Sequence, residues 1–140
     1  GKSEKMPRWL SDFIGTHSLH GRVYYRSRIA LRDMRAVYSY AEMFVYPSIY
    51  EGFGLPPLEA ASCGTPVIAS AATSILEIAG DFAVLINPSD VGALSQSLVS
   101  VLSDSALRSR CVESGKKVVA RYTWERSWQQ HVQVFQSICE

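Results

Sequence analysis

The chain has 140 residues, of which 47% are hydrophobic and 19% are charged, and it carries a formal net charge of +1. This composition is ordinary for a globular domain and excludes disordered, collagen-like and coiled-coil proteins. The near-neutral charge excludes a nucleic-acid partner, which would need a basic excess, and no apolar run reaches the roughly 18 residues of a membrane-spanning helix.

The first third of the chain mixes helical and strand-like patterns. Apolar residues at helical spacing predict one helix over Met6–Ile14 and a second over Ile29–Tyr40. Val23–Tyr25, between them, is a short run of β-type residues. Met43–Tyr46 is a compact apolar run ending at Pro47, which predicts a buried strand.

The middle of the chain continues this alternation. A Gly-rich loop leads into a helix over Pro56–Cys63, with Gly64 at its C-terminal cap, and Pro66–Ala69 is the next apolar strand. Ser74-Ile75-Leu76-Glu77 has the spacing of a capping box and predicts a short helix that ends at Gly80. Ala83–Ile86 is a fourth strand.

Three helices are predicted in the last third of the chain. Asp90 is a plausible N-cap, and the following helices span Leu94–Leu102 and Ala106–Ala120. Thr123 can cap a last helix over Trp124–Cys139. Four short strands alternating with helices predict an α/β fold whose parallel sheet is flanked by helices on both faces.

Chemistry is expected in the segment that follows Tyr46, because open parallel sheets bind ligands at the carboxyl ends of their strands. Gly52 and Gly54 stand directly before a helix start. Glycine lets the backbone approach a ligand closely, and a helix N-terminus offers free N–H groups, so phosphate is the expected ligand. A purely structural turn would give the same two glycines.

Two glutamates sharpen this interpretation. Glu51 stands in the loop and Glu59 is expected in the first helical turn, eight residues later. Carboxylates accept hydrogen bonds strongly from sugar hydroxyls, so one can bind a ribose and the other a donor sugar across a diphosphate. The alternatives are a favourable first-turn charge for Glu59 and a solvated loop residue for Glu51.

Other binding motifs fit less well. Gly52-Phe53-Gly54 begins like a dinucleotide fingerprint, but Pro57 replaces the third glycine and no acidic residue follows the next strand, which disfavours an NAD enzyme. No Gly-Lys-Ser/Thr follows, which excludes a Walker A loop. The three cysteines form no C-x-x-C pair, so we expect no metal site.

The run from Tyr46 to Ala60, with its E-x7-E spacing and Gly loop, resembles the signature of retaining glycosyltransferases of family 4 (glycosyl transferases group 1). Further matches are Cys63–Ser70, Ile75–Glu77, Gly80–Ala83, Asn87-Pro88 and Tyr122–Glu125. The resemblance runs from about Arg22 to the C-terminus. It implies the glycosyltransferase-B architecture, in which two Rossmann-like domains face each other across a cleft.

The resemblance also implies roles for individual residues. Glu51 would be the catalytic residue that contacts and positions the donor sugar, rather than a general acid or base. Glu59 would accept hydrogen bonds from the ribose. The donor sugar and diphosphate would lie against the backbone N–H groups of Gly52, Phe53, Gly54 and Leu55. Arg26 and Arg28 would lie near the nucleobase.

The family's reaction transfers a sugar from a nucleotide-diphosphate sugar with retention at the anomeric carbon, and the leaving diphosphate is stabilised electrostatically. The resemblance implies a hexosyltransferase with a GDP- or UDP-linked donor, leaning to mannose, in polysaccharide or lipopolysaccharide biosynthesis. Its acceptor would be a glycan or a lipid-linked sugar, and no cofactor or metal is implied. The alternative is a non-catalytic nucleotide- or sugar-binding module of the same fold.

The sequence departs from the family pattern at its start. The pattern expects a first strand followed by a loop with an Arg and a Lys, and about six strands rather than four. We therefore expect residues 1–140 to be the C-terminal nucleotide-sugar-binding domain, an incomplete half truncated at its N-terminal side, with the N-terminal acceptor domain absent. The start at Gly1 fits this expectation, and the fragment alone should be inactive.

Two surface features leave alternatives open. Five arginines, Arg22, Arg26, Arg28, Arg32 and Arg35, are either a solvated face or a contact for donor phosphate, base or anionic lipid. The last choice would suit a cytoplasmic protein that is peripheral at the inner face of the membrane. The apolar side of the last helix, with Trp124 and Trp128, either faces the missing domain or packs on its own sheet.

Overall fold

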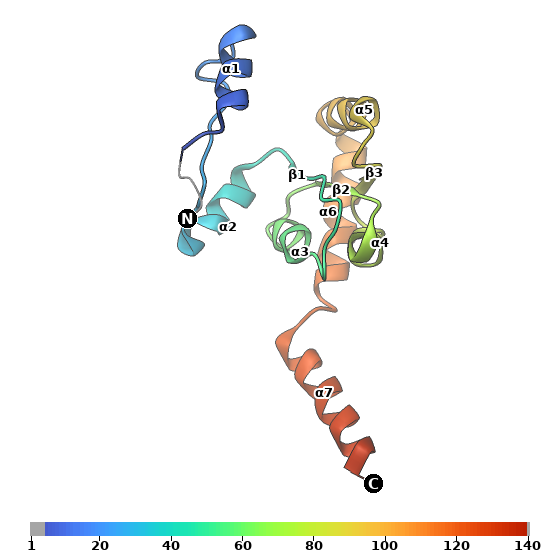
Figure 1. Cartoon of the computed structure of the whole chain (residues 1–140). Helices are drawn as coiled ribbons and strands as arrows, with labels where there is room; N and C mark the ends of the chain where they lie inside the picture. Colours follow the sequence, from blue (N-terminus) through green and yellow to red (C-terminus); the bar gives the residue numbers. More distant parts are fainter. Residues whose placement is uncertain (1–4, 140) are drawn as a thin grey trace. The chain divides into compact units, whose positions relative to one another are not determined.

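The computed structural model describes residues 5–139. The chain divides into two compact units, residues 1–34 and residues 35–140. The first unit holds helix α1 (Arg8–Thr16) and the first turn of α2 (Leu31–Tyr40), which continues into the second unit. Both helices lie where the apolar spacing predicted them (Figure 1).

The predicted strand over Val23–Tyr25 is wrong. Residues 23–26 form an irregular loop that pairs with no strand in the described part of the chain. Tyr24 is 76% exposed and Val23 is also exposed. Residues with a preference for strands become a strand only where a neighbouring strand accepts their backbone hydrogen bonds and covers their side chains.

The second unit is built on a parallel three-stranded sheet in the order β1-β2-β3. The strands are β1 (Phe44–Tyr46), β2 (Val67–Ser70) and β3 (Val84–Ile86). Phe44 is in register with Val67, and Ile68 with Val84. The α/β fold with a parallel sheet, as predicted from the alternation of apolar runs, is therefore confirmed, with three strands in the described residues rather than four.

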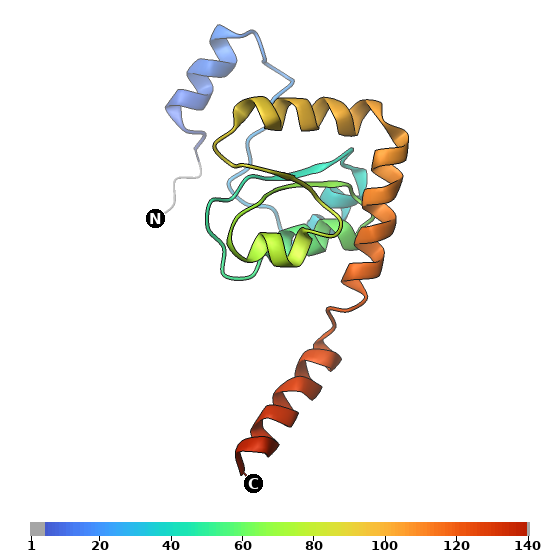
Figure 2. The same ribbon diagram turned by 90° about the vertical axis from the view of Figure 1, so that its right-hand side faces the viewer.

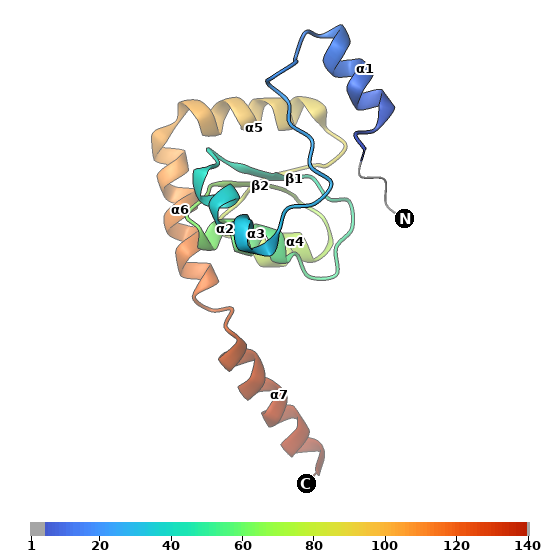
Figure 3. The ribbon, with the colours of Figure 1, turned by 90° about the vertical axis from the view of Figure 1, so that its left-hand side faces the viewer.

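Helices cover both faces of this sheet. The helices that follow β1 are α3 (Leu55–Ser62), α4 (Thr73–Ala79), α5 (Val91–Ser103), α6 (Ser105–Val119) and α7 (Trp124–Cys139). Figures 2 and 3 show α5 on one side of the sheet and α3 and α4 on the other. Ile68, Ile86 and Val101 form a buried core cluster between the sheet and α5.

Local chemistry sets several helix ends. Asp90 accepts a hydrogen bond from the Ala93 N–H at 2.8 Å, and Thr123 Oγ1 accepts one from the Arg126 N–H at 3.1 Å, so both predicted N-caps are confirmed. At the end of α3, Gly64 has a left-handed φ of +78° and lies one residue beyond the cap. The Thr65 N–H then bonds the Ala60 carbonyl at 3.1 Å, which closes a Schellman motif.

The predicted capping box is wrong. Helix α4 begins at Thr73, its N-cap residue is Ala72, and no side chain caps it. The Ser74 hydroxyl instead donates to the backbone carbonyl of Glu51 at 2.9 Å. The Ser74 hydroxyl therefore makes a tertiary hydrogen bond instead of the local helix-capping bond that the spacing predicted.

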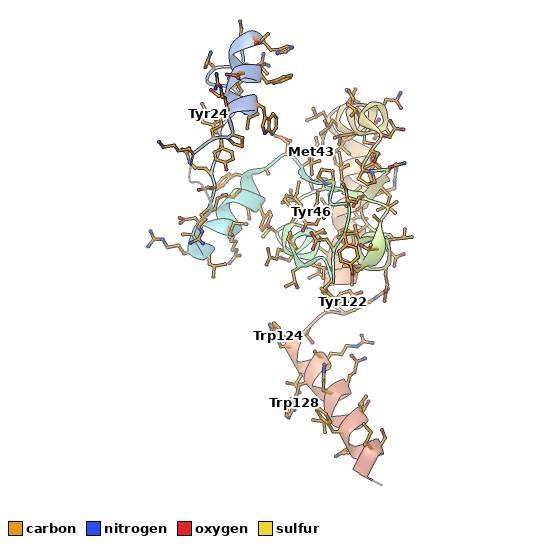
Figure 4. The ribbon with its side chains drawn as sticks, in the orientation of Figure 1. Tyr24, Met43, Tyr46, Tyr122, Trp124 and Trp128 are labelled. Atoms are coloured by element: carbon orange, nitrogen blue, oxygen red, sulfur yellow. The ribbon has the colours of Figure 1, made fainter. Side chains whose placement is uncertain are left out.

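The apolar side of α7 has no partner in the described chain. Trp124 is 87% exposed, Trp128 is 65% exposed and Phe135 is 63% exposed, and only Val132 is half-buried. Both tryptophans project outward from the helix (Figure 4). Of the two alternatives for this face, packing on its own sheet does not occur. None of the described helices is long and apolar enough to cross a membrane.

Candidate functional site

The loop between β1 and α3 leaves the sheet at the carboxyl ends of the strands. Tyr46 is the last residue of β1 and Ser70 the last of β2. The Ser70 hydroxyl donates a hydrogen bond to the Ser48 carbonyl and so fastens the loop to the end of β2. This edge of a parallel sheet is where open α/β folds bind ligands. The loop therefore lies where the sequence predicted a site.

The Glu51 carboxylate is held by two hydroxyl groups. Tyr46 donates to Glu51 Oε1 at 2.5 Å, and Ser48 donates to the same oxygen at 2.9 Å. These hydrogen bonds lower the pKa of Glu51, since they stabilise the charged form. No hydrogen bond from the described chain reaches Oε2. Glu51 is thus an anionic acceptor at neutral pH, with one oxygen fixed and one open.

The backbone of Glu51 is held as well, from the start of α4. Its N–H donates to Thr73 Oγ1 at 3.1 Å, and its carbonyl accepts the Ser74 hydroxyl at 2.9 Å. Thr73 has an uncommon left-handed φ of +45°. Thr73 and Ser74 begin α4, three and four residues after the end of β2, so segments that follow two neighbouring strands together fix one glutamate.

Sequence reasoning missed the residues that hold Glu51. The sequence pattern places Tyr46 at the end of a strand and Ser48 in a loop, and it predicts no contact of either with Glu51. The signal that could have found them is the sheet-edge rule itself, since side chains after neighbouring parallel strands meet at one edge. Applied to β2, the same rule points to Thr73 and Ser74.

Gly54 sets the start of α3. It is buried at the N-cap position with φ +102°, a conformation that residues with a Cβ adopt at a cost. A Cβ at this position would lie 2.6 Å from Ile75 Cδ1. The loop and α4 therefore approach each other more closely here than any side chain would allow.

The prolines restrict the N–H groups that this helix end can offer. Four N–H groups at a helix start have no partner within the helix, but Pro56 and Pro57 have none to give. Gly54 and Leu55 are left as donors, and neither N–H bonds to another part of the described chain. Of the helix-start N–H groups that the predicted anion site at Gly52–Leu55 could use, only those of Gly54 and Leu55 are therefore available, together with the backbone of Gly52 and Phe53 in the loop before them.

Glu59 lies one residue further from the start of its helix than predicted. Because Gly54 ends the loop, α3 begins at Leu55 and its first turn holds no acidic residue. The expectation of a first-turn charge is therefore wrong. Tyr38, on α2, donates to Glu59 Oε2 at 3.1 Å. The described chain makes no hydrogen bond to its other carboxylate oxygen.

The two tyrosines stay neutral well above neutral pH. Burial, together with the hydrogen bond to Glu51, raises the pKa of Tyr46 to about 12. Burial, together with the hydrogen bond to Glu59, raises the pKa of Tyr38 to about 12. Each phenol therefore remains a hydrogen-bond donor to its carboxylate across the whole physiological range.

A groove of about 590 Å³ adjoins the loop and α3. Its lining includes Phe53, Leu55 and Glu59 from the loop and α3, together with Tyr122 and Trp124 from the segment that leads into α7. The rings of Phe53 and Tyr122 meet edge to face, with centroids 6.0 Å apart. Three predicted site residues, Phe53, Leu55 and Glu59, thus share one concave surface with the segment that leads into α7.

The remaining predicted site residues lie in the first unit. Arg26 and Arg28 are exposed loop residues, and the Arg26 guanidinium donates to the Tyr25 carbonyl at 3.0 Å. Their role at a nucleobase stays a prediction. Within residues 5–139, no group of three or more His, Cys, Asp or Glu side chains is arranged to hold a metal ion.

Residues 1–118 match the family model described as glycosyl transferases group 1. The chain belongs to this family. The resemblance to glycosyl transferases group 1, stated for the run from Tyr46 to Ala60, is thereby confirmed. The O-antigen chain mannosyltransferase B of Escherichia coli is 37% identical over 126 residues, which cover 90% of this chain and 33% of that protein.

Two solved structures share the fold. Sucrose-phosphate synthase from Thermosynechococcus elongatus superimposes with a TM-score of 0.82 and 31% identity, over 94% of this chain and 34% of that one. The C-terminal domain of the group 1 glycosyl transferase LpcC from Francisella tularensis gives 0.71 and 28% identity, over 81% and 60% of the two chains. The chain spans about a third of the length of the Escherichia coli mannosyltransferase and of the sucrose-phosphate synthase.

Proposed function

We propose that this chain forms the donor-binding half of a retaining glycosyltransferase. Its donor is a nucleotide-diphosphate sugar, GDP- or UDP-linked, and the transferred sugar is a hexose. The name of the Escherichia coli relative favours mannose. The acceptor is a glycan or a lipid-linked sugar, bound by a part of the protein outside this chain.

The observation that supports this proposal best is the environment of Glu51. Its carboxylate is ionised, is fixed at the carboxyl end of the sheet and keeps Oε2 open. The N–H groups of Gly54 and Leu55, at the start of α3, stand three and four residues after Glu51. An anionic acceptor beside backbone donors suits a ligand that joins a hydroxyl-rich sugar to a diphosphate.

Glu51 acts in this proposal by holding the donor sugar. Its lowered pKa leaves it without a proton to give at neutral pH, which disfavours a role as general acid. The departing diphosphate gains negative charge, and the N–H groups at the start of α3 stabilise that charge. Glu59 accepts the ribose hydroxyls on the helix face where Tyr38 holds it.

The experiment measures sugar transfer by the longer protein that contains this chain, from radiolabelled GDP-mannose and, separately, UDP-glucose. Glu51→Gln keeps the size of the side chain and removes its charge, and we expect transfer to fall roughly 100-fold or more, as for loss of a group that acts on the transition state. Glu113→Gln, an exposed glutamate of α6, is the matched control and should retain full activity.

Three results are informative. Loss of transfer in Glu51→Gln with unchanged thermal unfolding supports the proposal. Saturable binding of a nucleotide sugar without any transfer would support the alternative, a non-catalytic binding module. Full activity of Glu51→Gln would contradict the assignment of the donor site to this loop.

A further inference from the structure

Both glutamates of the proposed donor site share one structural feature. Each accepts a hydrogen bond from a tyrosine hydroxyl, at 2.5 Å from Tyr46 to Glu51 Oε1 and at 3.1 Å from Tyr38 to Glu59 Oε2. In each carboxylate the tyrosine occupies one oxygen, and the described chain leaves the other without a hydrogen bond. The E-x7-E spacing alone gives no sign of these partners, because Tyr38 lies 21 residues before Glu59.

The two tyrosines belong to one aromatic row. The ring of Tyr38 meets the edge of Phe44 with centroids 5.2 Å apart, and Phe44 stacks on Tyr46 with centroids 5.7 Å apart. Phe44 and Tyr46 lie on the same face of β1, two residues apart. The row therefore runs from Glu59 at one end to Glu51 at the other.

The row is firmly attached to the fold. Tyr38 is only 5% exposed, and its backbone carbonyl accepts the buried Thr65 hydroxyl at 2.7 Å. Tyr46, which is labelled in Figure 4, is the last residue of β1. It is in register with the fully buried Ala69. Packed aromatic rings have few rotamers available, so each hydroxyl is presented in one direction before any ligand binds.

We infer that Tyr46 and Tyr38 are positioning residues of the donor site. Tyr46 fixes Glu51 so that Oε2 is free to accept from the hydroxyls of the transferred sugar, and Tyr38 does the same for Glu59 and the nucleoside. This inference rests on the proposed function. It adds that the two tyrosines act on different parts of the same ligand.

The test measures dissociation constants by calorimetry on the longer protein, with GDP-mannose and with GDP as probes. Tyr46→Phe removes one hydroxyl and keeps the ring. It should weaken binding of GDP-mannose about 3- to 10-fold, the value of one hydrogen bond, and leave binding of GDP unchanged. Tyr38→Phe should weaken the binding of GDP-mannose and of GDP by a similar factor, because both ligands contain the ribose.

A double-mutant cycle separates positioning from general packing. In a Glu51→Ala background, where the Tyr46 hydroxyl has lost its carboxylate acceptor, Tyr46→Phe should have no further effect on GDP-mannose binding. Ser48→Ala removes the other donor to Oε1 without touching the aromatic row, and it serves as the second variant if Tyr46→Phe unfolds. Tyr40→Phe, on the 90% exposed Tyr40 of α2, is the matched control and should bind like the wild type.

The outcomes distinguish this inference from the proposed function. If Glu51→Gln weakens GDP-mannose binding but Tyr46→Phe and Ser48→Ala do not, the positioning role is refuted and the donor site stands. Equal losses for GDP and GDP-mannose in Tyr46→Phe would also refute it. If Glu51→Gln itself leaves GDP-mannose binding unchanged, the proposed function fails.

Discussion

Replacing Gly54 with alanine should destabilise the second unit through two separate effects. The first is the backbone, because φ +102° costs a residue with a Cβ about 1–2 kcal/mol. The second is a clash, because the new Cβ would lie 2.6 Å from Ile75 Cδ1, and Ile75 is fully buried. Overpacking of this kind costs about 1–3 kcal/mol. Because alanine restricts the unfolded chain more than glycine does, it stabilises the protein by about 0.5 kcal/mol. We therefore expect the free energy of unfolding to fall by about 2–4 kcal/mol in total.

Urea denaturation of the wild type and of Gly54→Ala measures this loss. Gly52→Ala is the control from the same loop, since a Cβ at Gly52 meets no atom within 4 Å. Its effect should stay within about 0.5 kcal/mol. Ile75→Val removes Cδ1 and should itself cost about 1 kcal/mol. In that background the penalty of Gly54→Ala should fall to the backbone part, about 1–2 kcal/mol.

Two results would refute this reasoning. If Gly54→Ala is as stable as Gly52→Ala, the left-handed start of α3 is not required by the fold. If the penalty is unchanged in the Ile75→Val background, the close approach to Ile75 is not its source.

Three further predictions concern a helix cap, two tyrosines and the packing of α3 on α6. Asp90→Ala should cost about 1 kcal/mol by removing the N-cap of α5, and Asp90→Asn should restore most of it, as measured by urea denaturation. In a spectroscopic titration of the seven tyrosines, Tyr38 and Tyr46 should ionise only near pH 12. Because their pKa values in the folded protein lie above the ordinary 10.0, their contribution to the free energy of unfolding is complete below pH 10 and is lost as the pH rises through 12. Gly115→Val should cost about 1–3 kcal/mol, because a Cβ there lies 3.1 Å from Ala61 Cβ where α3 packs on α6, and adding Ala61→Gly should recover part of the loss.

Features with a local cause could be predicted from the sequence. Asp90 and Thr123 cap helices through bonds to residues three positions away, so the spacing alone identifies them. Gly64 ends α3 because a left-handed residue is needed one position beyond the cap. The strands β1, β2 and β3 are buried or half-buried, so each appears in the sequence as a short apolar run. The Gly loop before α3 could be predicted because its two glycines and the helix start that follows them are adjacent in the sequence.

Features with a distant cause could not be predicted in this way. Val23–Tyr25 has the residues of a strand but no paired neighbour, and pairing is not local. Ser74 has the spacing of a capping residue, but its hydroxyl bonds Glu51, 23 residues away in the chain. The support of Glu59 by Tyr38 spans 21 residues and depends on how α2 packs. The sequence thus located the two glutamates, whereas the fold determines what holds them.

The central claim is that a nucleotide sugar binds at the carboxyl end of the sheet, on the Gly54 and Leu55 N–H groups and the Glu51 carboxylate. The most direct measurement is an amide NMR titration with GDP-mannose, using protein labelled with ¹⁵N at glycine and leucine. We predict saturable shifts of the Gly54 and Leu55 amides and no shift of the Gly115 amide in α6. In Glu51→Gln, the same shifts should saturate only at higher GDP-mannose concentrations. Saturable shifts that leave the Gly54 and Leu55 amides unmoved, or the same saturation in Glu51→Gln, would contradict the claim.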